Sequence, residues 1–269
     1  YKNDLMQFYH SDHDCVVSYI EYLTDSTIKT NTLRRKIASL KVFYSYLMTQ
    51  NLITENPFNQ LRFQYRTEKT LPKIIPHNIL KNLYVYLKQR VITSKTNFQR
   101  QKAERNLLIV SLLLSTGIRI SELCHIQIKN INLQNQTLHI LGKGKKERII
   151  FLGDETTVLL LKTYLANYCK QSDKYLFPGK ISQKPLTEQS VRLVLKTVRE
   201  QMNLANSITP HMFRHSFATM LLDNDVDIRY IQQILGHSSI SITQIYTHVS
   251  QSKQKEILTS YNPIASIHT

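Results

Sequence analysis

Apolar residues recur every three or four positions along most of this chain, which is the spacing of amphipathic helices. The first such stripe is formed by Val16, Val17, Ile20 and Leu23, and the second spans about Thr32 to Thr49. The same spacing returns in four later stretches: Asn106–Leu114, about Asp154–Cys169, Thr187–Met202 and the region from Thr209-Pro210 onward, with a break at Gly236. The pattern therefore predicts a mainly α-helical protein.

The spacing changes between positions 131 and 152, where apolar and polar residues alternate as they do in strands. Three short stretches show it: Ile131–Leu133, Thr137–Leu141 and Glu147–Leu152. Short connections rich in Gln, Asn, Gly and Lys join them, so consecutive strands should pair antiparallel. We predict a small three-stranded antiparallel sheet within an otherwise helical chain.

A polar and basic stretch that carries Pro72 and Pro76 separates the first helices from the rest. Such a composition is typical of an interdomain linker. We expect a small helical domain at 1–65, a linker at 66–76 and a larger domain at 77–269.

The charge balance is the first indication of function. Lys and Arg number 35 against 19 Asp and Glu, a formal net charge of +16, which favours a polyanionic partner, by default a nucleic acid. The alternatives are a basic protein with no polyanionic partner and a membrane-surface binder. A surface binder usually concentrates its charge in one tail or helix.

No run of apolar residues is long enough to span a membrane and no signal peptide is evident. Three scattered cysteines fit a reducing cytoplasm.

Two arginines are candidates to bind a phosphate, because the guanidinium fork can contact two oxygens and stays charged. Arg119 follows the glycine that should end the 106–114 helix, and Arg214 shares a helix face with His211 and His215. The two histidines have the spacing of a metal pair. Met212 stands where a metalloprotease HExxH motif has glutamate, so we expect no metal.

A tyrosine near the C-terminal end is the candidate nucleophile. Tyr246 follows His237 by nine residues. A phenol with a pKa near ~10 needs a neighbour to take its proton before it attacks well. His211 is a plausible base, and Lys143, on a predicted hairpin, is a plausible proton donor to a leaving oxygen.

Five segments together resemble the tyrosine site-specific recombinases, and most closely their Xer branch. The segments are STGIRISEL (115–123), GKGKKERIIFLG (142–153), YLFP (175–178), TPHMFRHSFAT (209–219) and LGHSSISITQIYTH (235–248). Their order and spacing match over residues 77–250, and RRKIASLKVFYSYL with ENPF resembles the family's core-binding domain more loosely. The resemblance implies a two-domain clamp around duplex DNA.

The resemblance also implies a role for each matching residue. Arg119 and Arg214 would clamp the scissile phosphate, and Lys143 would protonate the leaving 5′ oxygen, with Lys145 close by but misplaced for that step. His211 would assist Tyr246, His237 would hydrogen-bond the phosphate, and Glu122 would orient the cluster. The family needs no metal and no nucleotide cofactor, and its members act as tetramers on two DNA sites.

Two parts of the chain are expected to contact DNA or a neighbouring protomer. Four basic residues of the second helix and one of the hairpin are candidate DNA contacts: Arg34, Arg35, Lys36, Lys41 and Lys145. A merely solvated basic face is the alternative. Residues from about Ser250 to Ile264 suit a tail that docks on a neighbouring protomer, unless that tail folds on its own domain.

Four functions are compatible with these features. The first is a chromosomal Xer recombinase that resolves chromosome dimers at a dif-like site and serves chromosome partition at cell division, with a DNA translocase of the FtsK type as possible partner. The second is an integrase of a phage, conjugative element or transposon, and the third a type IB topoisomerase. A non-catalytic DNA-binding protein would explain the charge alone.

Overall fold

The computed structural model describes residues 13–59, 61, 73–141, 147–170, 173–179, 184–236 and 251–268. The chain divides into two compact units, Tyr1–Leu71 and Pro72–Thr269, and each is considered by itself. The boundary falls inside the predicted linker. Lys73 to Pro76 belong to the second unit, where the buried Ile75 donates its backbone N–H to Ser216 Oγ at 2.8 Å.

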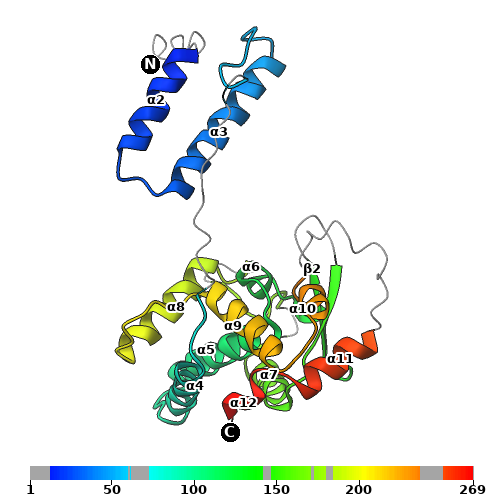
Figure 1. Ribbon diagram of the computed structural model, residues 1–269. Helices are drawn as coiled ribbons and strands as arrows, with labels where there is room; N and C mark the ends of the chain where they lie inside the picture. The colour runs from blue at the N-terminus through cyan, green and yellow to red at the C-terminus, as the bar shows by residue number, and fades with distance from the viewer. Residues whose placement is uncertain are drawn as a thin grey trace. The chain divides into compact units, whose positions relative to one another are not determined.

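In the first unit, α2 (His13–Asp25) and α3 (Thr30–Thr49) lie side by side (Figure 1). The apolar stripes predicted from the sequence meet between them. Buried side chains of α2, of α3 and of the following turn form a small core: Val16, Ile20, Leu23, Leu33, Ile37, Tyr44, Leu47 and Phe58. The rings of Tyr44 and Phe58 lie 5.6 Å apart.

The core of the second unit is built on α5 (Asn97–Thr116), which packs against three other helices. These are α4 (His77–Ile92), α7 (Glu155–Tyr168) and α9 (Pro210–Asp223). Every residue from Leu107 to Thr116 is buried, as expected of a helix that is apolar on all sides. α5 starts nine residues before the predicted helix, because Thr96 caps it by accepting from Gln99 N at 3.2 Å.

Five shorter elements complete the unit before its C-terminal part. They are α6 (Ile120–Cys124), the 3₁₀ helix η1 (Ile128–Asn130), α8 (Glu188–Gln201), α10 (Ile228–Leu235) and the sheet. The sheet has the order β1 (Ile131–Asn132), β2 (Thr137–Leu141), β3 (Glu147–Phe151), antiparallel throughout. The predicted fold class, mainly helical with a three-stranded antiparallel sheet, is confirmed.

The register of the sheet decides which side chains of β3 face the core. Leu138 pairs with Ile150, and Ile140 pairs with Arg148. Residues directly opposite each other share a face, and Leu138, Ile140 and Ile150 are all buried. Arg148 therefore lies on the core-facing side of the sheet.

The C-terminal part consists of α11 (Gln251–Ser260) and α12 (Ala265–His268), and it packs against its own chain (Figure 1). α12 contacts α4, and Asn262 Nδ2 donates to the carbonyl of Ser115 at 3.3 Å. The tail thus takes the arrangement that the sequence left as the alternative, while docking on a neighbour remains a prediction. Within the described ranges, no helix is both long and apolar enough to cross a membrane.

Candidate active site

Arg119 stands at the start of α6 because the chain reverses just before it. Gly117 ends α5 with φ 59°, a left-handed conformation that glycine adopts without steric cost. Ile118 is buried and anchors the turn. The side chain of Arg119 keeps 36% of its surface exposed, so it is positioned by the turn and still accessible from solvent.

Glu122 holds Arg119 at two points. Its Oε2 accepts the backbone N–H of Arg119 at 2.8 Å, and its Oε1 accepts from Nη1 at 3.0 Å. Glutamate at the third position of a helix often reaches back to cap the first N–H groups in this way. The predicted orienting residue therefore contacts the arginine directly, and its side chain is only 4% exposed.

Arg148 completes this cluster, and the sequence did not single it out. Its Nη1 and Nη2 donate to the two carboxylate oxygens of Glu122 at 2.7 and 2.9 Å. Burial alone would raise the pKa of Glu122, but hydrogen bonds and charge from Arg148 and Arg119 outweigh it and lower that pKa. The carboxylate is therefore ionised at neutral pH. The pairing links positions 26 residues apart, so no local motif could have revealed it.

Arg214 is the second predicted phosphate ligand, and it is 7% exposed. Its Nη1 donates to the carbonyl of Gly117 at 2.8 Å and its Nη2 to that of Leu235 at 2.7 Å. Burial, with a smaller contribution from the charge of Arg119, lowers the pKa of Arg214 to about 10. The guanidinium still carries its charge at neutral pH.

The end of α10 brings the two predicted clamp arginines to one short segment. Arg119 Nη2 donates to the carbonyl of Gly236 at 3.1 Å, next to the Leu235 carbonyl that Arg214 binds. Gly236 has φ 65° and ends α10. The residue that follows it in the sequence is His237. Hydrogen bonds therefore join both arginines to Leu235 and Gly236, the two residues directly before His237.

His211 lies in the first turn of α9, which begins as predicted with Thr209 as N-cap and Pro210 next. Its side chain is exposed, as is that of His215 one turn later. Burial and the charges of His211 and Arg214 lower the pKa of His215. Two imidazoles thus stand on the surface beside the buried Arg214.

The other predicted site residues lie outside the described residues: Lys143, Lys145, His237 and Tyr246. The structure does describe residues that flank these segments in the sequence. Leu141 and Glu147, which pair at the end of the ladder, flank positions 142–146. Gly236 precedes position 237 directly.

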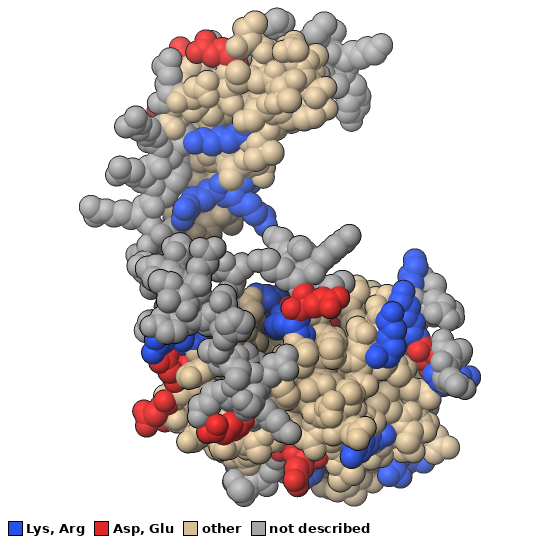
Figure 2. All heavy atoms as spheres, turned by 90° about the vertical axis from the view of Figure 1, so that its right-hand side faces the viewer, with Lys and Arg blue, Asp and Glu red and all other residues tan. Residues whose placement is uncertain are grey.

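The basic residues predicted to contact DNA in the first unit all lie on α3. Arg34, Arg35 and Lys36 are exposed and Lys41 is half-buried. Figure 2 shows Lys and Arg side chains in several separate groups on the described surface, with acidic side chains between some of them. Exposed basic side chains are thus present on both units.

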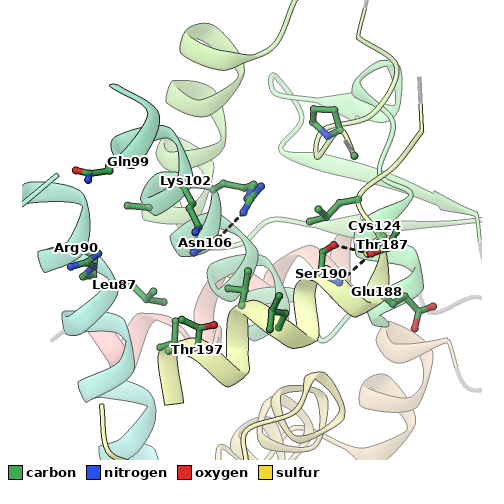
Figure 3. Close-up of a pocket in the computed structure, with 18 of the residues that line it drawn as sticks. Leu87, Arg90, Gln99, Lys102, Asn106, Cys124, Thr187, Glu188, Ser190 and Thr197 are labelled. Atoms are coloured by element: carbon green, nitrogen blue, oxygen red, sulfur yellow. Dashed lines mark hydrogen bonds between the residues drawn. The ribbon is translucent and has the colours of Figure 1, made fainter. Parts of the chain in front are cut away.

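An open groove lies apart from the arginine cluster. It has a volume of about 1170 Å³ and is lined by side chains of α4, α5 and α8 together with the chain leading into α8 (Figure 3). At its edge Ser190 N donates to the capping hydroxyl of Thr187 at 3.1 Å. Arg119, His211 and Arg214 do not line it. Among the described residues, no group of three His, Cys, Asp or Glu side chains is placed to hold a metal ion.

Two fixed guanidinium groups beside an exposed imidazole define a site suited to an anionic phosphate.

The sequence model of the Phage integrase family matches residues 83–253 of this chain. A tyrosine recombinase of Agathobacter rectalis is 46% identical over all of this chain and 90% of its own length. The tyrosine recombinase XerC of Staphylococcus haemolyticus is 34% identical over 98% of this chain and 90% of its own.

Two solved structures resemble the whole chain. The XerA recombinase has a TM-score of 0.53 and 27% identity, covering 97% of this chain and 89% of its own. The XerH recombinase bound to palindromic difH substrate has a TM-score of 0.68 at 22% identity, covering 93% and 72%. The chain belongs to the phage integrase family, the tyrosine site-specific recombinases. It is accordingly a DNA strand transferase, an enzyme that acts on DNA.

Proposed function

We propose that this recombinase cleaves each strand with Tyr246 and resolves chromosome dimers at a dif-like site, as a Xer recombinase of the cytoplasm. The observation that carries the proposal is the joining of Arg119 and Arg214 to the Leu235–Gly236 segment, directly before His237. The relatives named XerC support the Xer assignment. In this reaction the Tyr246 oxygen bonds to phosphorus while the 5′ oxygen leaves, so a 3′-phosphotyrosine holds the broken strand.

The charges of the cluster suit that reaction. Arg119 and Arg148 donate to one carboxylate, that of Glu122. Counted with Arg214, the three arginines and this carboxylate leave two positive charges for the phosphate. A phosphodiester carries one negative charge and develops a second in the transition state. Fixed donors that meet developing charge lower the barrier without reorganising. In this proposal Arg119 and Arg214 bind the non-bridging oxygens.

The proton transfers are assigned to residues other than the arginines. His211, exposed at the start of α9, takes or shares the proton of Tyr246 as it attacks. Lys143 gives a proton to the departing 5′ oxygen, and His237 hydrogen-bonds the phosphate. Rejoining runs the same steps in reverse, and the phosphotyrosine conserves the energy of the broken bond.

The assembly we propose is a homotetramer on two DNA sites. The basic residues of α3 and Lys145 contact the DNA backbone, and a translocase of the FtsK type activates the complex. An integrase of a phage or conjugative element would use the same chemistry, and a different DNA site would distinguish it.

A nicked suicide duplex carrying a dif-like site tests the proposal. Cleavage releases a short fragment, so the enzyme stays trapped on the DNA and migrates slowly in a denaturing gel. Tyr246→Phe should abolish the trapped band while binding the same duplex within about two-fold, because only the nucleophilic oxygen is lost. Labelling either end of the cut strand identifies which end the protein holds.

The matched control is Tyr261→Phe, which removes a hydroxyl from an exposed tyrosine of the tail and should trap as the unaltered chain does. A trapped band that persists in Tyr246→Phe would refute the nucleophile. Efficient trapping on mobile-element ends but not on dif-like DNA would refute the chromosomal role and leave the chemistry intact.

A further inference from the structure

Arg148 is an inward-facing charged residue in a row of apolar ones. On the core-facing side of β2 and β3, the pair Leu138–Ile150 is followed by the pair Ile140–Arg148. Its side chain is 17% exposed. A largely buried arginine carries a desolvation cost unless its hydrogen bonds are made, and this one lies beside Glu122, which holds Arg119.

Both terminal nitrogens of Arg148 are engaged by one carboxylate. The fork contacts the two oxygens of Glu122, and within the described part of the chain its buried Nε has no hydrogen-bond partner. This bidentate geometry is the strongest that the two side chains can form. Two of the five N–H donors of Arg148 are therefore committed to Glu122, which holds Arg119.

Arg148 also supports the turn that leads to His237. A Cβ built on Gly236 would lie 3.1 Å from Nη1 of Arg148 and 3.2 Å from its Cδ. The arginine side chain thus packs directly under the glycine whose carbonyl Arg119 binds. The side chain of Arg148 thus has two neighbours: the carboxylate of Glu122, which orients Arg119, and the backbone at Gly236, directly before His237.

We propose that Arg148 is a positioning residue for DNA cleavage: it neutralises and orients Glu122, which in turn holds Arg119, and it joins this pair to β3 of the hairpin that carries Lys143. The inference rests on the proposed function. Without Arg148, the buried carboxylate of Glu122 keeps only Arg119 as a charged partner, and its negative charge opposes binding of the phosphate at Arg119. DNA binding draws on many other basic residues and is nearly independent of Arg148.

A merely structural ion pair would give a different result from a positioning pair. Loss of a structural pair lowers stability and reduces binding and cleavage together. Loss of a positioning pair slows cleavage on bound DNA, and its effect depends on whether Glu122 is still charged. The comparison of cleavage with binding and stability separates the two roles. A double-mutant cycle tests in addition whether Arg148 and Glu122 act through one another, since the losses of such residues do not multiply.

The experiment compares Arg148→Met, Glu122→Gln and the double variant in single-turnover trapping on the suicide duplex, with binding and thermal unfolding measured alongside. Arg100→Met is the matched control, because Arg100 also pairs with a largely buried glutamate, Glu104, at 3.0 Å. Arg100 lies about 24 Å back along α5 from Thr116, at ~1.5 Å per residue.

Arg148→Met should slow trapping by about 100-fold, the scale of a misplacement of about 1 Å, with binding changed less than about three-fold. The double variant should be no slower than Arg148→Met, and Arg100→Met should trap nearly as the unaltered chain does. Should Arg148→Met fail to fold, Arg148→Lys keeps the charge without the fork. It should then slow trapping while melting close to the unaltered chain.

A pH profile supplies a readout that a structural pair would not move. Loss of Arg148 raises the pKa of Glu122, since burial is then opposed by Arg119 alone. Lower pH protonates Glu122, so trapping by Arg148→Met, relative to the unaltered chain, should improve as pH falls. The double variant has no carboxylate at this position and should show a constant ratio.

Three results would overturn this inference alone: losses that multiply in the double variant, an equal loss of binding and cleavage, or unchanged trapping by Arg148→Met. Failure of the unaltered chain to form any Tyr246-dependent complex would instead overturn the proposed function, and this inference with it.

Discussion

Two glycines and two arginines fasten together the ends of helices α5 and α10. Gly117 and Gly236 both adopt left-handed backbone, at φ 59° and 65°. Arg214 binds the carbonyl of Gly117, and Arg119 binds that of Gly236. Each glycine thus shapes the turn before one predicted catalytic residue and provides a hydrogen-bond acceptor to another.

Replacing each glycine by alanine tests this arrangement. Left-handed backbone costs a residue with a Cβ roughly 1–2 kcal/mol, so both variants should lose that much free energy of unfolding. Gly117→Ala should lose about 1–3 kcal/mol more, the usual cost of overpacking. Its Cβ would meet the buried Phe217 at 2.5 Å and Leu235 at 2.7 Å. Denaturant unfolding of both variants measures the difference.

Gly236→Asn is the control, because asparagine tolerates this conformation better than alanine. It should be more stable than Gly236→Ala. Equal losses for Gly117→Ala and Gly236→Ala would contradict the difference in packing.

Motifs predicted the residues whose function depends on local geometry. Arg119 and Arg214 were found because a glycine cap and a Thr-Pro helix start stand beside them, and Glu122 because the resemblance to the family implies a role at its position. Arg148 was not, because its position follows from strand register and from Glu122, which is distant in sequence. The placement of Lys143, His237 and Tyr246 lies outside the described residues, so their roles remain predictions.

At the level of elements, the C-terminal tail is part of the core of its own unit. Ile257 and Leu258 pack with residues of α9 and α10, while Ile264 and Ile267 join the main core. A Cβ on Gly153 would lie 1.8 Å from the carbonyl oxygen of Leu258, so backbone meets backbone there. The tail closes over a surface that would otherwise expose apolar side chains to water.

Ile264→Ala should therefore destabilise the single chain by about 2–5 kcal/mol, as large-to-small changes in a core do. The drop in melting temperature should be the same at low and high protein concentration, because the contact lies within one chain. Scanning calorimetry over a range of concentrations measures it.

Tyr261→Ala serves as the control, since Tyr261 is exposed in the same tail and should change stability by about 0.5 kcal/mol or less. A destabilisation that disappears on dilution would point instead to docking of the tail on a neighbouring chain.

Helical spacing predicted most elements to within a few residues, and α5 shows where it fails. The first turns of α5 carry Asn, Gln, Arg, Lys and Glu with few apolar side chains. No stripe marks them, so only the apolar second half was predicted. The cap at Thr96 and packing within the folded unit extend the helix toward its N-terminus. Neither effect produces a periodic pattern of apolar residues in the sequence.

At the scale of the whole molecule, most of the formal net charge of +16 falls on the second unit, although exposed basic residues are present on both. Basic residues of α3 lie in the first unit, and the arginine cluster lies in the second. Basic side chains from the two units can together neutralise many phosphates of a duplex. Most of the binding free energy should then come from released counterions rather than from base contacts.

Binding should consequently weaken steeply with salt. The logarithm of the association constant should fall by about 0.9 per neutralised phosphate for each unit of log salt. Fluorescence anisotropy with a labelled duplex at several salt concentrations gives the slope. If Arg35 binds a phosphate, Arg35→Met should reduce the magnitude of this slope by about 0.9, the contribution of one phosphate contact.

Lys81→Met removes an equal charge from the exposed face of α4 and provides the comparison for a charge without a proposed DNA contact. A nearly flat salt response of the unaltered chain would contradict binding led by phosphates.

The register of the sheet also limits where the chain tolerates changes in length. Arg148 faces Glu122 because it stands opposite Ile140 in the ladder. One residue added or removed within β3 would turn Arg148 to the opposite face, since side chains alternate along a strand. Changes beyond the Leu141–Glu147 pair leave that alternation intact. Natural and engineered variants should therefore differ in length at positions 142–146 far more readily than between 147 and 151.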